Sequence, residues 1–255
     1  MIDTHCHLCD KRFDKDRQQV FDRAHQSGVT HFVEIAYSPE IWERGFALAA
    51  EHADLFLCLG VHPSESGRVP IDQLDALREH ARHPRVVAIG ETGMDFYRDH
   101  AAREQQERWF RAQLALCDEV GLPVVIHQRS ALEDVMGILE AARPEAGGVL
   151  HCFDQDVATM RRAEALGFKL GLGGVLTYGH DPLDEAVRLA PEHMLVLETD
   201  APYLEPEPRS LRRNEPGLLP RVVRRLCELR DWTPQQAIEV TRRNARELFR
   251  LPIAA

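Results

Sequence analysis

The stretch IDTHCHL, residues 2–8, is a short apolar run that ends in two histidines, and similar runs recur along the chain. In a β-strand successive side chains alternate between faces, so His5 and His7 would project from one side and Cys6 and Leu8 from the other. Two imidazoles on one face provide half of a site for a divalent cation. A chance pair of partly buried histidines would have the same spacing. The other runs must decide between these interpretations.

Eight such β-branched runs alternate with stretches of helical periodicity. Strands are expected at residues 1–7, 31–36, 55–61, 86–90, 123–127, 148–152, 168–172 and 194–198. Helices are expected between them at residues 14–26, 39–52, 71–82, 103–120, 131–142, 156–166 and 183–189. Eight alternating units predict an α/β fold that closes into a (β/α)8 TIM-like barrel. An open doubly wound sheet is the alternative, but no G-x-G-x-x-G motif follows the first strand.

Residues 1–255 are expected to form a single domain, since α/β barrels of this length are common and no linker or low-complexity segment interrupts the chain. A proline-rich loop at residues 201–220 follows the last predicted strand. Two extra C-terminal helices, at residues 221–230 and 234–249, should then cover the outside or one end of the barrel.

The bulk composition limits the compartment and the partner. Six cysteines without a signal peptide favour free thiols, and the C-x-x-C pair at residues 6–9 lacks the second pair of a zinc ribbon. No apolar run is long enough to span a membrane, so a cytoplasmic protein with no membrane partner is expected. A formal net charge of -10 argues against binding long duplex nucleic acid through a broad basic face. A short or terminal piece of nucleic acid stays compatible with this charge, because bound metal ions would supply local positive charge.

Imidazole and carboxylate side chains occur where the predicted strands end, which is where barrel enzymes carry their active sites. They are His5, His7, His62, Glu91, His127, His151 and Asp200. Any one histidine could be an ordinary core residue, but burying the whole set together without a cation would be costly. The set exceeds the ligands of one tetrahedral zinc, so two divalent ions are the economical interpretation.

A carboxylate is the natural bridge between two such ions, and the fourth predicted strand offers Glu91. Many binuclear barrel hydrolases use a carboxylated lysine on that strand instead. This chain has only three lysines, Lys11, Lys15 and Lys169, and none lies on the fourth strand.

Eight short blocks in this sequence resemble, in order and spacing, those of the TatD family of metal-dependent deoxyribonucleases. They are DTHCHL (3–8), GVHP (60–63), GETGMD (90–95), HQR (127–129), HCF (151–153), ETDAPYL (198–204), RNEP (213–216) and NAR (244–246). The resemblance extends from residue 3 to about residue 249. Met94 stands where the family usually has leucine, and Gln128 where a small polar residue is common. Neither departure falls on a proposed ligand.

The resemblance implies a barrel of the amidohydrolase-like, metal-dependent hydrolase type that cleaves DNA phosphodiester bonds, often as a 3′ to 5′ exonuclease. It implies that His5, His7, Glu91 and Asp200 bind one divalent ion, and that Glu91, His127 and His151 bind the other. His62 would then lie beside the scissile phosphate. Arg129 and Arg213 resemble the family's phosphate-side arginines, although structural ion pairs explain such arginines equally well.

The mechanistic hypothesis assigns catalytic roles to three of these residues. Asp200 would accept a proton from the attacking water, Glu91 would bridge the ions, and His62 would stabilise charge on the phosphoryl group. Imidazole with carboxylate suits Zn²⁺ or Mn²⁺, whereas Mg²⁺ would bind weakly and exchangeably. Tyr97 follows a strand end, where its ring could stack on a base or simply pack the loop.

The expected substrate is single-stranded DNA or a 3′ end, bound by a monomer. Two alternatives stay open. The first keeps the metals but acts on a small molecule, as amidohydrolases do, or on an aminoacyl-tRNA ester, as a deacylase. The second is a metal-binding barrel without catalysis.

Overall fold

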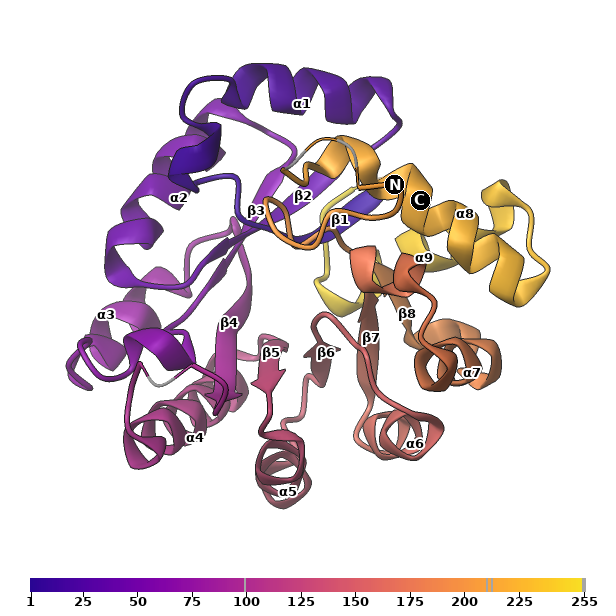
Figure 1. Cartoon of the computed structure of the whole chain (residues 1–255). Coiled ribbons are helices and arrows are strands. Elements are labelled where there is room, and N and C mark those ends of the chain that lie inside the picture. Colours follow the sequence, from indigo (N-terminus) through magenta and orange to yellow (C-terminus); the bar gives the residue numbers. More distant parts are fainter. Residues whose placement is uncertain (99, 210, 212, 254–255) are drawn as a thin grey trace. The chain divides into compact units, whose positions relative to one another are not determined.

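The structure is a computed structural model that describes residues 1–98, 100–209, 211 and 213–253. Its strands and helices alternate along the chain, beginning with a strand (Figure 1). The strands are β1 (Ile2–Cys6), β2 (His31–Ala36), β3 (Leu55–Leu59), β4 (Val86–Asp95), β5 (Val124–Arg129), β6 (Gly148–Leu150), β7 (Phe168–Leu172) and β8 (Leu195–Leu197).

A helix follows every strand before the next strand begins. These helices are α1 (Arg17–Gln26), α2 (Pro39–Glu51), α3 (Gln73–His80), α4 (Arg103–Val120), α5 (Leu132–Ala142), α6 (Val157–Ala165), α7 (Asp181–Leu189) and α8 (Leu219–Arg230), and α9 (Pro234–Leu248) comes last. Short 3₁₀ helices occur in the connections, among them η1 (Lys11–Phe13) and η2 (Pro63–Glu65). Within the described residues, no helix has the length and apolar character that crossing a membrane requires.

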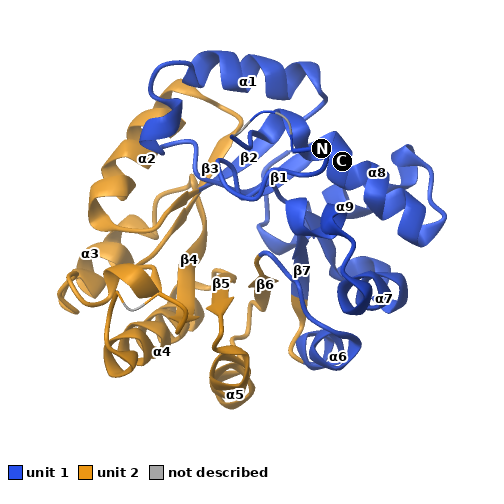
Figure 2. Ribbon diagram, viewed as in Figure 1, with its two compact units in different colours: residues 1–34, 152–165, 169–255 blue, residues 35–151, 166–168 orange. Residues whose placement is uncertain are grey.

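The chain divides into two compact units, shown in different colours in Figure 2. Unit 1 comprises residues 1–34, 152–165 and 169–255, and unit 2 comprises residues 35–151 and 166–168. In unit 1, β1 pairs in parallel with the start of β2, and β7 pairs in parallel with β8. An isolated parallel bridge between Cys6 and Ala201 joins β1 to the segment that follows β8. In unit 2, parallel pairing connects β3 to β4, β4 to β5 and β5 to β6.

The strand order in the sheet follows the chain from β1 to β8. Parallel strands in chain order, each followed by a helix, define the (β/α)8 fold class, so the predicted fold is confirmed. Helices lie at both predicted C-terminal positions: α8 is the helix that follows β8, and α9 comes after the eight strand–helix pairs. Within the predicted loop at 201–220, residues 210 and 212 lie outside the described part of the chain. Residues 99, 254 and 255 also lie outside it. The single domain over residues 1–255 stays a prediction.

Local sequence signals account for several element boundaries. Thr233 caps α9: its side chain accepts the backbone N–H of Gln236, whose side chain in turn accepts the backbone N–H of Thr233. At the other end of a helix, Gly121 adopts the left-handed conformation, with φ of 69°, that stops α4. The aromatic rings of Phe21 on α1 and Phe32 on β2 meet edge to face at 5.1 Å in the core of unit 1.

The largest error in a predicted boundary is at the end of β4. β4 was expected to end at Gly90, but it continues through Glu91 to Asp95. The pairing with β5 shifts register between Gly90 and Thr92 and then continues from Thr92–Ile126 to Asp95–Arg129. Glu91 therefore lies inside a fully buried strand, at the position where the pairing with β5 is irregular. Such an irregularity changes the direction in which a side chain leaves the strand.

Candidate metal centre

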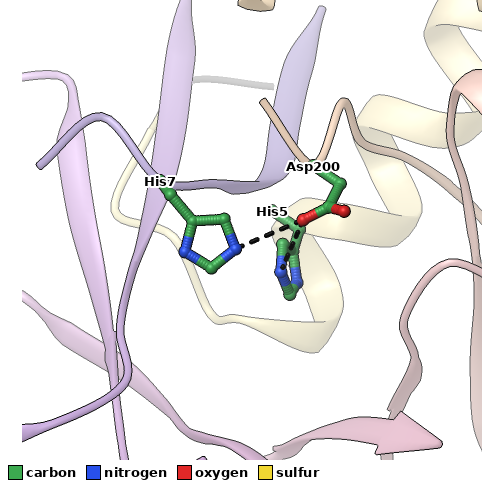
Figure 3. A group of neighbouring side chains, drawn as sticks. All are labelled: His5, His7 and Asp200. Atoms are coloured by element: carbon green, nitrogen blue, oxygen red, sulfur yellow. Dashed lines mark hydrogen bonds and ion pairs between the residues drawn. The ribbon is translucent and has the colours of Figure 1, made fainter. Parts of the chain in front are cut away.

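Unit 1 brings together three of the predicted ligands, His5, His7 and Asp200, which we call the unit 1 cluster. The Nε2 atoms of His7 and His5 lie 3.2 Å and 3.6 Å from the same carboxylate oxygen of Asp200. Figure 3 shows both imidazoles directed at this oxygen, with the two rings edge to face at 5.2 Å. His5 is fully buried. The cluster thus has the donor atoms of a cation site at the ends of β1 and β8.

Backbone hydrogen bonds hold these three residues in place. The Asp200 N–H donates to the carbonyl of His5 at 2.8 Å, and the His7 N–H donates to the carbonyl of Ala201 at 2.8 Å. Asp200 has a φ of 54°, which is unusual for a residue with a side chain. The side-chain amide of Asn214 donates to the carbonyls of Thr199 and Tyr203, on either side of Asp200. The loop after β8 is therefore fixed by contacts that are remote in the sequence.

Asp3 connects the two segments that carry the unit 1 cluster. Its carboxylate accepts the hydroxyl of Thr199 at 2.6 Å and the backbone N–H groups of Thr199 and His5 at 3.0 and 3.3 Å. Full burial raises the pKa of Asp3 to about 7, although these hydrogen bonds pull it in the opposite direction. Asp3 acts on the cluster through the backbone and belongs to the same DTHCHL block as His5.

Unit 2 brings together His62, Glu91, His127 and His151, which we call the unit 2 cluster. One oxygen of Glu91 is surrounded by three imidazoles, at 2.8 Å from Nδ1 of His127, 3.3 Å from Nε2 of His151 and 3.7 Å from Nε2 of His62. Glu91 is 4% exposed, so this carboxylate is almost removed from solvent. It lies at the centre of the histidines, as expected for a carboxylate that shares a metal with them.

His62 was expected beside the substrate phosphate, apart from the metal ligands. Instead, His62, Glu91 and His127 together form a group with the geometry of a metal site. The Nδ1 atom of His62 is occupied by Ser64, whose hydroxyl and backbone N–H lie 2.8 and 3.0 Å away. The Nε2 atom is therefore the one turned toward Glu91. In this structure His62 is as well placed to bind an ion as to contact a phosphate.

Asp95 contacts the cluster but was not singled out from the sequence. Its Oδ2 lies 3.3 Å from Nε2 of His127, while Glu91 approaches the other ring nitrogen. Burial alone would raise the pKa of Asp95, but His127 and the backbone N–H groups of Arg98 and Tyr97 lower it to about 2. Burial alone would lower the pKa of His127, but Asp95 and Glu91 raise it above its usual value. The sequence did contain a signal for Asp95, because Asp95 is the last residue of the GETGMD block that also contains Glu91.

Two buried glutamines of α4 hold the backbone on which the unit 2 cluster is built. The side chain of Gln113 accepts the N–H of Val61 at 2.8 Å and donates to the carbonyl of Val61 and the hydroxyl of Thr92 at 3.0 and 2.7 Å. Two helical turns earlier, Gln106 accepts the N–H of Asp95 at 2.8 Å and donates to its carbonyl at 3.1 Å. Val61 precedes His62, and Thr92 follows Glu91. The helix after β4 thus positions two ligand-bearing segments.

The two arginines predicted near the phosphate have different surroundings. The guanidinium of Arg129 lies 4.0 Å from the ring centroid of Tyr97, which is 68% exposed, so these two residues form a surface stack. Both nitrogens Nη1 and Nη2 of Arg213 donate to Asp16, at 2.8 and 2.7 Å. The structure therefore shows an ion pair at Arg213, and the predicted role of Arg213 beside a phosphate stays a prediction.

The residues present fit divalent cations. In each of the groups His5–His7–Asp200 and His62–Glu91–His127, one ligand atom per residue lies within 4.8 Å of the others. Two ligands about 2.1 Å from one ion are separated by up to about 4 Å, so small side-chain movements would bring either group into coordination distance. Buried imidazoles with carboxylates match Zn²⁺ and Mn²⁺ better than Mg²⁺. The predicted bridge from Glu91 to the unit 1 cluster involves both units and stays a prediction.

Comparison with known proteins places these residues in a family. A sequence profile described as TatD related DNase matches residues 2–250. The chain belongs to the TatD family. One relative comes from Pantoea vagans (strain C9-1) and is named 3′-5′ ssDNA/RNA exonuclease TatD. It is 37% identical to this TatD family member over 260 residues, and the match covers 98% of this chain and 100% of that protein.

Other relatives agree at the level of the reaction class and the fold. The Bacillus subtilis (strain 168) protein named uncharacterized metal-dependent hydrolase YabD is 34% identical over 253 residues, covering 98% of this chain and 99% of that protein. The crystal structure of YjjV, a TatD homolog from Escherichia coli K12, has a TM-score of 0.93 and 31% identity, covering 99% of this chain and 98% of that one. This TatD family member is accordingly a metal-dependent hydrolase with a (β/α)8 fold.

Proposed function

We propose that this TatD family member removes nucleotides from the 3′ ends of single-stranded DNA, using two divalent ions bound by the unit 1 and unit 2 clusters. The observation that carries the proposal is the carboxylate oxygen of Glu91, which lies 2.8 Å from Nδ1 of His127 and 3.3 Å from Nε2 of His151, since these donor atoms suit a catalytic divalent ion. The nuclease names of several relatives support the choice of substrate. Mn²⁺ and Zn²⁺ suit the donor atoms, and Mg²⁺ would bind more weakly.

The metal ligands in this proposal are His5, His7, Glu91, His127, His151 and Asp200. When bound, the ions would lower the pKa of a water molecule and polarise the phosphoryl oxygens. Asp200 accepts the proton of the attacking water on a carboxylate oxygen. The water oxygen forms a bond to phosphorus, and the bond between phosphorus and the 3′ oxygen of the preceding nucleotide breaks. That oxygen keeps the electron pair and takes a proton from solvent, so the strand ends in a 3′-hydroxyl and a nucleoside 5′-monophosphate is released.

The remaining residues bind and orient the strand. Nε2 of His62, fixed by the Ser64 contact at Nδ1, donates to a phosphoryl oxygen as charge develops on it. The stack of Arg129 on Tyr97 offers a flat surface to an unpaired base beside the unit 2 cluster. Arg213 contributes to substrate binding indirectly, through the Asp16 ion pair that orders its loop.

The substitution Glu91→Gln tests the proposal because it keeps the shape of the side chain and removes its charge. We expect the release of nucleotides from a 5′-labelled single-stranded oligonucleotide to fall by more than about 100-fold, since even outer partners of metal ligands contribute about 10–100-fold. The assay compares Mg²⁺, Mn²⁺ and Zn²⁺ with an EDTA control. Asp184→Asn is the matched control, because Asp184 is also buried but pairs with Arg225 outside both clusters.

Three results would count against this function. Full activity of Glu91→Gln would exclude the metal role of Glu91. Full activity in EDTA would exclude the metals. Turnover of amide substrates or of an aminoacyl-tRNA ester, with none on the oligonucleotide, would favour the alternative hydrolase activities.

A further inference from the structure

Tyr203 and Arg12 form a stack that contacts the unit 1 cluster. The ring of Tyr203 lies edge to face against that of His7, with centroids 5.7 Å apart. The guanidinium of Arg12 lies 4.2 Å from the centroid of the same tyrosine ring. Tyr203 remains 39% exposed. A partly exposed aromatic surface thus extends from a candidate metal ligand to an arginine.

Asp10 fixes the orientation of Arg12. Its two carboxylate oxygens accept Nε and Nη2 of Arg12 at 2.9 and 2.8 Å, a paired arrangement that holds the guanidinium plane. The same carboxylate accepts the backbone N–H of Arg12 at 2.8 Å and caps η1. Arg12 therefore contributes a rigid flat face whose charge is largely offset by Asp10, rather than a mobile cation.

A flat guanidinium held against an aromatic ring suits a nucleobase. Unpaired bases stack on aromatic side chains and on arginine planes, whatever their sequence. A phosphate would instead seek an arginine whose charge is not already paired. The chemistry of this surface therefore points to the π-face of a base.

We propose that the Arg12–Tyr203 stack is a binding site for an unpaired nucleobase of the single-stranded substrate, next to the ion held by the unit 1 cluster. This inference rests on the proposed function and assigns Arg12, which the sequence did not single out, to substrate binding. Its site lies in unit 1 and is distinct from the Arg129–Tyr97 stack of unit 2. DNA and RNA bases share the recognised face, so both serve as probes.

Binding is measured by fluorescence anisotropy with Mg²⁺ present, using labelled single-stranded DNA and RNA oligonucleotides with phosphorothioate linkages at the 3′ end. Arg12 is the residue to change, because variants at Tyr203 would also disturb His7. We expect Arg12→Ala to weaken binding by about 5-fold to 150-fold, the range of one lost stacking contact. Arg12→Lys keeps the charge but lacks the flat face, so it should lose as much affinity as Arg12→Ala.

Salt dependence separates stacking from phosphate binding. Removing one phosphate contact lowers the slope of log affinity against log salt by about one. Arg12→Ala should lower the affinity and leave that slope as it is in the unaltered chain. A slope lower by about one in Arg12→Ala, with the affinity and slope retained in Arg12→Lys, would overturn the proposal in favour of a phosphate contact.

Arg209→Ala is the matched control. The guanidinium of Arg209 also lies over a tyrosine ring of unit 1, 4.0 Å from the centroid of Tyr178. The Tyr178 hydroxyl, however, donates to the carbonyl of Glu205, whereas the Tyr203 ring contacts His7. It should bind both oligonucleotides with unchanged affinity. Unchanged binding by the Arg12 variants, or an equal loss in Arg209→Ala, would overturn the stacking site. Loss of binding in the Arg12 variants would support the stacking site, whether or not the unaltered chain cleaves a phosphodiester. A lack of cleavage by the unaltered chain would refute only the proposed function.

Discussion

Arg213 donates to both carboxylate oxygens of Asp16 and, through Nη1, to the backbone carbonyl of Arg12 at 2.7 Å. A carboxylate oxygen of Glu215 lies 3.7 Å from Nη2 of Arg213, and the same carboxylate forms an ion pair with Arg23. These contacts join the loop after β8 to the segment after β1, both within unit 1. At the residue scale, Arg213 stabilises the surroundings of the Arg12–Tyr203 stack.

This ion pair predicts a dependence of stability on pH. Hydrogen bonding to Arg213 lowers the pKa of Asp16 from 3.8 to about 2. The native state thus favours the ionised carboxylate, so the pair's contribution is present above about pH 4 and is lost as the pH falls through about 2. We expect Arg213→Gln to lower the free energy of unfolding by about 1 kcal/mol at neutral pH, since the pair is partly exposed, and by less as the pH approaches 2.

Urea unfolding of both proteins between pH 2 and neutral pH measures this difference. Arg161→Gln, which removes a solvent-exposed pair with Glu164 on α6, is the control and should change stability little at any pH. A constant difference between Arg213→Gln and the unaltered chain down to pH 2 would contradict the role of Asp16.

At the scale of elements, α4 does more than cover a strand. Its buried residues Gln106 and Gln113 are spaced two helical turns apart. Gln106 bonds the backbone of Asp95, and Gln113 bonds the hydroxyl of Thr92 and the backbone of Val61. Gly60 lies against this contact: a Cβ there would come within 2.6 Å of the Gln113 side-chain oxygen and 2.5 Å of the carbonyl of Gly90. The geometry of the unit 2 cluster therefore depends on a helix that supplies no ligand.

We expect Gln113→Leu to leave the N–H and carbonyl of Val61 without their partner and to reduce the free energy of unfolding by about 2 kcal/mol or more. It should also weaken Mn²⁺ binding at the unit 2 cluster by about 10-fold or more, as loss of supporting contacts around metal ligands does. Calorimetric titration of metal-stripped protein, well below the unfolding temperature, measures both metal sites. The exposed Gln105→Leu on the same helix is the control, and equal Mn²⁺ affinities in the two variants would refute the positioning role of Gln113.

At the scale of the whole molecule, the unit 1 cluster consists of residues of unit 1 alone, and the unit 2 cluster consists of residues of unit 2 alone. Each ion should therefore stabilise the unit that binds it. Binding to the native state alone adds about 2.7 kcal/mol when the free ion is at 100 times its dissociation constant. We expect EDTA to lower the unfolding temperature and Mn²⁺ to restore it, with two ions bound per chain.

Variants of one cluster should remove one ion and leave the other. His7→Ala, in unit 1, and His127→Ala, in unit 2, are each expected to reduce the Mn²⁺ stoichiometry from two to one. Equilibrium dialysis with metal analysis measures the stoichiometry, and thermal unfolding measures the stabilisation that remains. One ion per unaltered chain, or loss of both ions in His7→Ala, would show that the clusters do not act as separate sites.

The order of strands and helices was predictable because it depends on local patterns. Strands β1 to β8 coincide with the expected apolar runs to within a few residues, except at the end of β4. Its extension to Asp95 depends on pairing with β5, whose residues are more than thirty positions away along the chain. A local pattern cannot register that pairing, since the GETGMD segment contains two glycines and resembles a turn.

The (β/α)8 class, the family and the kinds of side chain available to bind metal are predictable from the amino-acid sequence. These follow from hydrophobic period, strand length and the positions of histidines and carboxylates relative to the apolar runs. The partners that these side chains meet depend on the tertiary fold: Asp95 contacts His127, Gln113 bonds Val61 and Thr92, Asp16 pairs with Arg213, and Asp10 holds Arg12 over Tyr203. Local sequence patterns do not predict these contacts, because hydrogen bonds and ring contacts act over a few ångströms in space, whereas Asp16 and Arg213 are 197 residues apart in the chain.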